Sequence, residues 1–551
     1  MNKSVRNKRA TKYVFVVGGV MSGVGKGVSA SSIALLLKSR GLKVTAVKID
    51  PYINVDAGTM NPTEHGEVFV LKDGLETDQD MGNYERFLGE NLPRINYMTT
   101  GSVYLSVIEQ ERKLAYKGKN VEVVPDIPLE VIRRIKLAAK TATADVVMVE
   151  IGGTVGEYQN ILFLEAVRML KQERPDDVIT VMVSYLPVPG SIGEMKTKPT
   201  QTAVRALNSA GVFADFIIAR SPVAIDQKRK DKIATFCNVK SDHVISAPDL
   251  PSIYDIPGVF EADGLSDKLC RALKLKPKPA DLKAWQAFVK KTKFPRREIN
   301  IAVVGKYFSS GDFMISDVYL SVLEALKYSA YHNGSKLKLT YLSAVDFAKY
   351  EACSALSVYA GVLVPGGFGE TGVAGKLNVI RYARENKIPY FGICYGMQLM
   401  VIEFARHVAG LKQAHTTEVN PKTPDPVVAV MDSQAEIVKA GQLGGTMRLG
   451  EYTAKLRKGS LARAAYGVDQ VVERHRHRYE VNPAYVDILK KAGLIFSGES
   501  PDGKLMEIAE LPKTRHPFML GVQFHPELLA RPLIPHPLFS AFIKAALKSQ
   551  K

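Results

Sequence analysis

Cysteine and tryptophan are scarce in this chain of 551 residues, which contains four cysteines and one tryptophan. The cysteines are scattered without a CxxC pair, which argues against disulfides and a zinc cage and indicates a reducing, cytoplasmic environment. No apolar run approaches the ~18 residues that a membrane span needs, so no membrane partner is expected. The basic residues 1–12 have no apolar core like that of a secretory signal, and we expect them to form a disordered tail.

Acidic residues are also fewer than basic ones, with 56 Asp and Glu against 74 Lys and Arg and a net charge of +18. Such a charge can serve nucleic-acid binding, but no basic stripe with interleaved aromatic residues occurs. We therefore favour an anionic small-molecule substrate and a solvated basic surface over a nucleic-acid partner, although composition alone leaves both open. The length is too great for one core and predicts about three or four folded units, because a single unit usually holds ~150 residues.

Near the start, a glycine-rich turn connects a predicted strand to a predicted helix. The strand is the apolar run Val14–Val17, and the helix begins near Ser29. Glycine N–H groups and a helix N-terminus can hold phosphate oxygens, and Lys26 would add a mobile cation. The match to GxxxxGK[ST] is imperfect, since Val20 replaces the first glycine and Gly27 replaces the hydroxyl residue that holds Mg²⁺. The alternative is a glycine-rich turn that only packs a helix against a strand.

The first half of the chain alternates strand-like and helix-like segments. Residues 44–50, 144–157, 178–186 and 214–221 are apolar runs typical of buried strands. This alternation predicts an α/β fold with a doubly wound parallel sheet, whose ligands bind at the carboxyl ends of the strands. A long segment after Asp50, rich in Asp, Glu, Gly and Asn, has the length of a functional loop.

A proline- and lysine-rich stretch separates this pattern from a second one. We interpret residues 273–298 as an interdomain linker, in which Trp285 is expected to pack rather than to form a site. A strand begins again at 299–307, and a second α/β pattern runs to the end of the chain. The predicted domains are therefore 13–272 and 299–551.

The second domain contains a cysteine between two glycines at a strand-to-helix turn. A sharp turn at Cys394 would expose the sulfur, and the following helix N-terminus would favour a reactive thiol. His525 follows another apolar strand, and Glu527 can orient its imidazole. Gly366 and Gly367 end a third strand and offer N–H groups for an oxyanion. Each feature alone is common in structural turns, but three of them at strand ends form a specific constellation.

Together these residues resemble a class I glutamine amidotransferase domain. The resemblance implies that Cys394 attacks the side-chain amide of glutamine, forms a glutamyl thioester and releases ammonia. It also implies an oxyanion hole at Gly367 and Tyr395. Glutamine would be held by Gly367, Tyr395, Gly396, Met397, Gln398, Glu418 and Arg478. His475 and His477 suggest a metal, but the arginines that flank them argue against one.

Further motifs over nearly the whole chain resemble the CTP synthase family, among them GGVMSGVGKG, VKIDPYINVDAGTMNP, GNYERF, VEIGGTVGE, GEMKTKPTQ and RHRHRYEVN. The resemblance implies that ATP phosphorylates O4 of UTP and that ammonia displaces this phosphate, which gives CTP, ADP and phosphate. It also implies internal passage of ammonia, stimulation by GTP and inhibition by the product CTP. The family forms homotetramers, built as dimers of dimers, and often filaments.

The resemblance also assigns residues to the two nucleotides and to Mg²⁺. ATP would bind Gly23, Val24, Gly25, Lys26, Gly27, Val28 and Asp80. UTP or CTP would bind Ser22, Lys48, Glu157, Tyr158, Gln159, Lys196, Thr197, Lys198, Pro199, Thr200, Gln201 and Lys232. Asp80 and Glu150 are oxygen ligands suited to Mg²⁺ and would replace the hydroxyl that is missing at Gly27. The alternative for the segment KTKPTQ is a solvated basic turn.

Several positions depart from the family pattern. Tyr395 stands where leucine is usual, which could alter the glutamine pocket or the ammonia exit. Thr371 replaces an arginine in the lid linked to GTP activation, and Ser102 stands where arginine or lysine is usual. Asp126 replaces a histidine near the triphosphates, and Glu157–Gln159 replaces Asp-Ile-Glu in the segment tied to CTP feedback. These departures concern regulation and nucleotide affinity, and catalysis is predicted to survive them.

The predicted function is ATP-dependent amination of UTP to CTP with ammonia from glutamine, the last step of de novo CTP synthesis. A first rival is a phosphate-loop amidotransferase that acts on a carboxylate, but it would have no reason to contain KTKPTQ and GNYERF. A second rival is a non-enzymatic protein that assembles into filaments or binds nucleic acid through its charge. Formation of CTP from UTP separates the predicted function from both.

Overall fold

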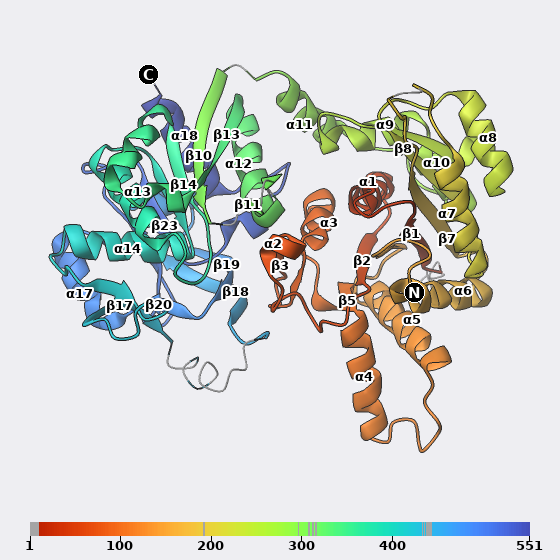
Figure 1. Cartoon of the computed structure of the whole chain (residues 1–551), viewed down its shortest axis with the longest axis horizontal. Coiled ribbons are helices and arrows are strands. Elements are labelled where there is room, and N and C mark those ends of the chain that lie inside the picture. The colour runs from red at the N-terminus through yellow and green to blue at the C-terminus, as the bar shows by residue number, and fades with distance from the viewer. Residues whose placement is uncertain are drawn as a thin grey trace, which may run out of the picture. The chain divides into compact units, whose positions relative to one another are not determined.

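The computed structural model describes residues 10–190, 193–295, 297–306, 309–310, 313–314, 317–431, 434, 436 and 444–550. The chain divides into two compact units, whose elements are labelled in Figure 1. These are fewer and larger than the about three or four units that the length alone predicted. Unit 1 comprises the residues up to Asp56 together with Asn83–Val289, and unit 2 comprises Ala57–Gly82 and the residues from Lys290 onward. Within the described residues, no helix is both long and apolar enough to cross a membrane.

The described part of unit 1 is built on one parallel sheet of seven strands. Their order across the sheet is β5 (Tyr97–Thr99), β2 (Val44–Asp50), β6 (Val146–Ile151), β1 (Lys12–Gly18), β7 (Val178–Tyr185), β8 (Phe216–Ser221) and β9 (Val244–Pro248). Strand β1 pairs in parallel with both β6 and β7. Its residues Val14–Val17 are buried, as expected for a parallel strand that is covered on both faces. The prediction of a doubly wound parallel sheet is confirmed.

Helices lie in the connections between these strands: α1 (Lys26–Ser39), α4 (Thr100–Arg112), α5 (Val123–Thr141), α6 (Ile161–Glu173), α7 (Lys198–Ser209) and α8 (Gln227–Cys237). Two more helices, α9 (Ile256–Ala262) and α10 (Leu265–Ala272), follow the last strand. From β1 the chain passes to β2, on one side of β1 in the sheet. After β6 it crosses to β7, on the other side of β1. Because parallel connections are right-handed, this reversal places helices on both faces of the sheet.

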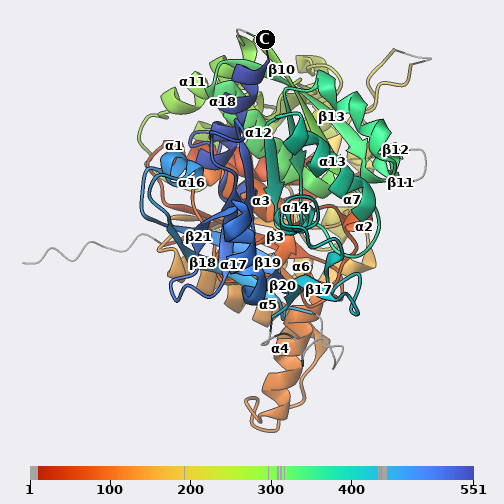
Figure 2. The same cartoon turned by 90° about the vertical axis from the view of Figure 1, so that its left-hand side faces the viewer.

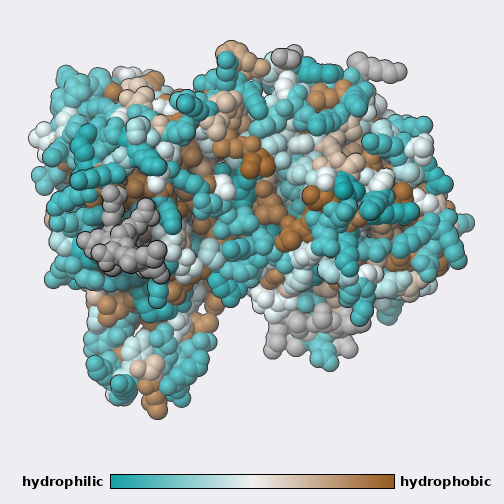
Figure 3. Space-filling view, turned by 180° about the vertical axis from the view of Figure 1, so that it is seen from behind, coloured by the Kyte–Doolittle hydropathy of each residue, from teal (hydrophilic) through white to brown (hydrophobic). Residues whose placement is uncertain are grey.

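Helices α4 and α5 pack against each other, and α4 extends away from the sheet in Figures 1 and 2. This projecting pair carries exposed apolar side chains, among them Leu105, Ile108 and Leu114. Apolar surface is also visible on the projection in the space-filling view (Figure 3).

The segment predicted as a linker contains a packed helix, α11 (Lys283–Lys293). Trp285 on this helix is buried, and its indole N–H donates a 2.9 Å hydrogen bond to the carbonyl of Tyr254. Its ring also packs against Phe87 and Phe288. Trp285 is therefore a packing residue, as expected, and the first part of the segment belongs to unit 1 up to Val289.

Unit 2 contains a mixed sheet of nine described strands. In order they are β13 (Ser335–Ser343), β10 (Arg297–Gly305), β14 (Gly361–Val364), β15 (Tyr390–Ile393), β23 (Met519–Val522), β22 (Met506–Glu510), β21 (Ile495–Glu499), β18 (Arg448–Leu456) and β19 (Gln470–His477). The first five run parallel, and the remaining pairs are antiparallel. The second predicted α/β pattern is confirmed.

Smaller elements surround this sheet. Strands β16 (Ala414–Thr416), β17 (Asp425–Val430) and β20 (Tyr479–Val481) form a separate small sheet, and β11 (Ser309–Ser310) pairs with β12 (Phe313–Met314). The main helices are α12 (Leu320–His332), α13 (Val373–Glu385), α14 (Tyr395–His407), α16 (Leu461–Tyr466), α17 (Pro483–Ala492) and α18 (Pro537–Ser549).

The long segment after Asp50 is not a plain loop, which corrects the expectation from the sequence. It contains the short helix α2 (Pro62–His65), the hairpin strands β3 (Val68–Val70) and β4 (Glu76–Asp78), and the start of α3 (Asp80–Leu88). The hairpin belongs to unit 2, where two arginines of β19 contact it. Arg474 donates to the carbonyl of Val70 at 3.0 Å, and Arg476 pairs with Glu76 at 2.7 Å. These long-range contacts, which local composition does not reveal, hold the segment in place.

Candidate active sites

Cys394 lies at a sharp turn between β15 and α14. Its backbone has a φ of 51°, a conformation that few residues other than glycine adopt and that clusters at functional sites. A Cβ at Gly392 would lie 2.7 Å from the carbonyl carbon of Gly396, and one at Gly396 would lie 2.2 Å from the oxygen of Val364. Only glycine fits on either side, so the predicted sharp turn is present. It does not expose the residue to open solvent, because Cys394 is only 2% exposed and lines a cavity instead.

The sulfur of Cys394 lies among polar groups at the N-terminus of α14. Gln523 Nε2 lies 3.7 Å from the sulfur as a donor, and the thiol lies 3.9 Å from the carbonyl oxygen of Arg476. Gln523 also accepts a 3.2 Å hydrogen bond from Gln398 Nε2. The sequence analysis missed Gln523, although it stands two residues before His525, where the end of a buried strand would place it near the nucleophile.

His525 and Glu527 are in contact, as the predicted acid–base pair requires. His525 Nδ1 lies 2.7 Å from Glu527 Oε1. Burial lowers the pKa of His525, but the Glu527 carboxylate and the Cys394 sulfur outweigh this effect and raise the pKa to about 10. A Cβ built on Gly366 would lie 3.0 Å from His525 and 3.7 Å from Cys394, so the imidazole and the thiol flank the same glycine.

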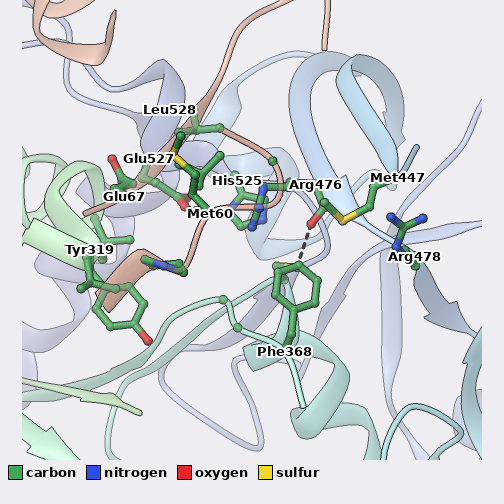
Figure 4. Close-up of a pocket in the computed structure, with 18 of the residues that line it drawn as sticks. Met60, Glu67, Tyr319, Phe368, Met447, Arg476, Arg478, His525, Glu527 and Leu528 are labelled. Atoms are coloured by element: carbon green, nitrogen blue, oxygen red, sulfur yellow. Dashed lines mark hydrogen bonds and ion pairs between the residues drawn. The ribbon is translucent and has the colours of Figure 1, made fainter. Parts of the chain in front are cut away.

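These residues line a cavity of about 290 Å³ within unit 2. Figure 4 shows Tyr319, Phe368, Arg478 and His525 around it. Five of the residues predicted from the sequence line this cavity: Gly367, Cys394, Arg478, His525 and Glu527. The chain segment that follows Ala57 lines it as well, through Gly58, Thr59, Met60, Pro62, Glu67 and Val68. That segment contains the sequence GTMNP, so a family motif from the first half of the chain lies in the glutaminase-like unit.

Two backbone elements could stabilise an oxyanion beside Cys394. Gly366 and Gly367 follow β14 directly and line the cavity. Tyr395 is the first residue of α14, and the amides of a first helical turn are not used by the helix itself. The glycine turn follows β14 and Tyr395 follows β15, and these two strands are parallel neighbours in the sheet. Their carboxyl ends therefore bring both sets of amides near the sulfur.

The other residues predicted to hold glutamine lie around the cavity rather than in its lining. Gln398 donates to the carbonyl of Tyr479 at 2.9 Å, and Glu418 accepts a 2.6 Å hydrogen bond from the Gly369 N–H. Burial raises the pKa of Glu418, against the opposing effects of the Gly369 N–H and nearby lysines. Gly396 and Met397 are buried in the first turn of α14.

His475 and His477 are buried on β19, with His475 Nδ1 2.9 Å from His477 Nε2. Burial lowers the pKa of both, and the charge of Arg448 lowers it further. Arg448 pairs with Glu480 at 3.0 Å and with Glu507 at 2.8 Å. Among the described residues, no group of three or more His, Cys, Asp or Glu side chains has the geometry to hold a metal ion.

In unit 1, Lys26 lies over the glycine turn that follows β1. Its Nζ donates a 2.9 Å hydrogen bond to the carbonyl of Gly153. A Cβ at Gly18 would lie 2.7 Å from the Lys26 side chain, and Gly25 has a φ of 89° at the start of α1. Glycine is thus required both for the turn and for the close approach of the lysine, as a phosphate-binding loop needs.

A buried charge cluster lies at the ends of β2 and β6. Lys48 Nζ lies 2.9 Å from Glu150 Oε1 and 3.5 Å from Asp50 Oδ1. Tyr84 donates to the other oxygen of Glu150, and Tyr97 donates to Asp50 at 3.0 Å. Glu150 is only 1% exposed. Glu150 thus presents carboxylate oxygens, the donor type that Mg²⁺ prefers, and these oxygens contact Lys48 and Tyr84.

Asp80, the other predicted Mg²⁺ ligand, begins α3 and is assigned to unit 2. Its backbone N–H donates to Asp78 Oδ1 at 2.9 Å. The pairing of Asp80 with Glu150 at one ion therefore stays a prediction.

A small apolar cavity of about 100 Å³ adjoins the phosphate loop in unit 1. Gly25, Val28 and Ser29 form its loop side. Residues from distant segments form the rest: Arg220, Ala247, Pro248, Leu250, Ile253, Ile256, Val259 and Phe260. The sequence analysis missed these residues because they meet only through the sheet, at the ends of β8 and β9.

The residues predicted for the pyrimidine nucleotide differ in exposure. Ser22, Lys198 and Lys232 are exposed, and Tyr158 is 96% exposed. Lys196 pairs with Glu194 at 2.7 Å. In contrast, Thr197, Thr200 and Gln201 are buried and bond within the protein, Thr200 to Ser184 at 2.8 Å and Gln201 to Thr197 at 3.1 Å. These three side chains anchor the start of α7.

Comparison with known proteins covers almost the whole chain. A family model described as the CTP synthase N-terminus matches residues 12–275, and one described as glutamine amidotransferase class-I matches residues 314–545. The chain is 47% identical to a CTP synthase of Symbiobacterium thermophilum, over 98% of both proteins. It is 49% identical to a CTP synthase of Pyrococcus furiosus, over 97% of this chain and 98% of the relative.

Proposed function

Because this chain belongs to the CTP synthase family, it converts UTP to CTP with glutamine, and we propose that unit 2 releases the ammonia while unit 1 activates the UTP. The observation that supports this division most is the Cys394 turn beside the His525–Glu527 pair in one cavity of unit 2. The match over the full length favours CTP synthesis over both rivals, a carboxylate ligase and a non-enzymatic protein.

Glutamine hydrolysis in unit 2 would follow the chemistry of an activated thiol. The Cys394 sulfur attacks the side-chain carbonyl carbon of glutamine, and the thiol proton resides on His525. The imidazolium then protonates the leaving nitrogen, so that ammonia departs and a thioester forms. Glu527 stabilises the positive imidazole through its 2.7 Å contact. The amides of Gly367 and Tyr395 would stabilise the oxyanion.

The charged residues around the cavity suit the two ends of a glutamine molecule. Arg478 lines the cavity and would face the α-carboxylate. Glu418 would face the α-ammonium, whose charge favours the ionised form of a carboxyl that burial otherwise disfavours. The wall of the pocket would be formed by Gly396, Met397 and Gln398, which would not touch the reacting amide.

In unit 1, Lys26 and residues 23–28 would hold the ATP phosphates, and the adjoining apolar cavity would take a flat base such as adenine. Lys48 would lie near the phosphoryl group as it moves to O4 of UTP. Ammonia then displaces that phosphate at C4. Asp80 and Glu150 would hold Mg²⁺, which supplies charge neutralisation for phosphoryl transfer when bound.

The remaining assignments follow the family. UTP or CTP would contact Ser22, the KTKPTQ segment, Glu157–Gln159 and Lys232. GTP would stimulate glutamine hydrolysis, CTP would inhibit, and the protein would act in the cytoplasm as a homotetramer that forms filaments. The synthetase domain would span 13–272 and the amidotransferase domain 299–551, with the linker at 273–298.

An absorbance assay of CTP formation tests the proposal. UTP, ATP and Mg²⁺ are mixed with the full-length protein and with either glutamine or an ammonium salt, each with and without GTP. The proposal predicts CTP with both nitrogen sources, and stimulation by GTP only with glutamine. If ammonium supports CTP formation but glutamine does not, the assignment of unit 2 is wrong. If neither supports it, the assignment of unit 1 is wrong too.

A further inference from the structure

Lys376 on α13 is a fully buried lysine that no proposed catalytic step uses. Its side chain has 0% exposure, and its ammonium nitrogen has no hydrogen-bond partner among the described residues. Burial of a polar group without a partner is costly, and native proteins contain few such groups. A lysine at this position therefore calls for a functional explanation.

The nitrogen of Lys376 faces the ring of the residue that follows the nucleophile. It lies 5.3 Å from the centroid of the Tyr395 ring, within the range of a cation–π interaction. The Tyr395 hydroxyl donates a 3.1 Å hydrogen bond to the carbonyl of Gly369. The N–H of Gly369 donates in turn to Glu418 at 2.6 Å. Tyr395 and Glu418 thus hold Gly369 by its carbonyl and its amide.

The contacts of Tyr395 connect Lys376 to the predicted oxyanion hole. The backbone amide of Tyr395 is one predicted oxyanion donor, and its hydroxyl holds the turn that contains the other donor, Gly367. The ring between these two groups is the part that contacts Lys376. A change in the position of the ring would therefore affect both donors.

The charge of Lys376 varies in the neutral pH range. Burial, and to a smaller extent the charge of Lys306, lower its pKa to about 7, against the opposing effects of Cys394 and Glu418. These described groups face Lys376 from the end of β10, the nucleophile turn and the loop after β16, and Tyr395 faces it from α14. The protonated amine is attracted to the Tyr395 ring, and the neutral amine is not.

We propose that Lys376 is a positioning residue for glutamine hydrolysis, whose protonated amine holds the Tyr395 ring and, through the Tyr395 hydroxyl, the glycine turn beside the oxyanion hole. The proposal rests on the proposed glutaminase function of unit 2. It gives a role to the tyrosine that departs from the family pattern, since a leucine at 395 would offer the amine no aromatic ring.

Glutamine hydrolysis by the full-length protein, measured across the neutral pH range, tests the role of Lys376. In the wild-type protein, kcat falls as the pH rises through about 7, because the amine loses its proton. Lys376→Met removes this fall and lowers kcat at the acidic end by about 3- to 10-fold, the range expected for one cation–π contact, with little change in KM. Lys513→Met, the matched control at an exposed lysine of unit 2, leaves both unchanged.

Variants of Tyr395 separate positioning from simple packing. Because Lys376 acts through the ring, Lys376→Met should cost nothing further in a Tyr395→Leu background. Tyr395→Phe keeps the ring and hence the pH dependence, but loses the hydrogen bond to Gly369 and part of kcat. Equal losses from Lys376→Met in both backgrounds would overturn the proposal, as would a Lys376→Met variant with the wild-type pH profile.

Thermal unfolding shows whether a loss of activity is only a loss of folding. The folded-state pKa of Lys376 lies below the unfolded value, so the unfolded state binds more protons between the two values, and wild-type stability rises with pH above about 7. Lys376→Met lacks this rise and melts no lower than wild type at acidic pH, because it buries no ammonium. A lower melting temperature there would contradict the assignment. A wild-type protein without any glutaminase activity would contradict the proposed function instead.

Discussion

Cys394, the predicted nucleophile, has a strained backbone with a φ of 51°. A non-glycine residue with positive φ costs ~1–3 kcal/mol and persists only where the surroundings hold it. Here the N–H of Cys394 donates a 2.6 Å hydrogen bond to Val522 on the neighbouring strand, and the flanking glycines leave no room for another side chain. The strain points the sulfur into the cavity that also contains His525 and Glu527.

At the same scale, Glu527→Gln tests the charge of the acid–base pair. The Glu527 carboxylate and Cys394 overcome burial to raise the pKa of His525 to about 10, and a neutral amide would lower that pKa and stabilise the imidazolium less. We expect kcat for glutamine hydrolysis to fall at least ~100-fold, measured as glutamate release. Ammonia-dependent CTP formation serves as the control and should not change. A glutaminase rate close to wild type would exclude Glu527 from the pair.

At the scale of elements, strands were easier to predict from the sequence than the parts that connect them. The runs at 44–50 and 178–186 are apolar because parallel strands are buried on both faces. The hairpin β3–β4 and the strand β5 gave no such signal, because each of these strands has only three residues. The position of the hairpin also depends on contacts with distant residues such as Arg476. The same reason explains why the Lys376–Tyr395 contact was not predicted, although both residues belong to recognisable helices.

The turn between β15 and α14 can be tested by adding a single methyl group. Gly396→Ala would place a Cβ 2.2 Å from the carbonyl oxygen of Val364, so the turn must open. We expect a melting temperature lower by about 3–10 °C for unit 2 and a loss of glutaminase activity. Gly258→Ala, in α9 of unit 1, is the control for an added methyl group, because a Cβ there meets nothing within 4 Å, and it should leave the melting of unit 2 unchanged. Equal melting curves for both variants would show that the turn tolerates a side chain.

A single substitution also tests whether the glycine turn after β1 binds phosphate, because Lys26 is its cation. Lys26→Ala removes the ammonium that lies over the glycine turn. CTP formation should fall by ~100-fold or more with either nitrogen source, because phosphoryl transfer depends on such fixed charges. Glutamine hydrolysis should persist, since its residues lie in unit 2. Normal CTP formation by Lys26→Ala would favour the alternative of a turn that only packs a helix.

At the scale of the whole molecule, each half forms its own α/β unit. The sequence predicted both units, and the candidate catalytic residues that it named in the second half lie at one cavity of unit 2, because glycines at strand ends leave a clear pattern around Cys394 and Gly367. The sequence analysis placed the segment after Asp50 with the first domain, whereas residues Ala57–Gly82 belong to unit 2 and several of them line the cavity beside Cys394. Local composition contains no information about which unit a segment packs against.

The most direct test of the account is CTP formation by Cys394→Ala with each nitrogen source. The account predicts that the glutamine-dependent rate falls ~1000-fold or more, because the thioester forms on the Cys394 sulfur, while the ammonia-dependent rate stays within about twofold of wild type. Glutamine-dependent CTP formation at the wild-type rate by Cys394→Ala would contradict the account.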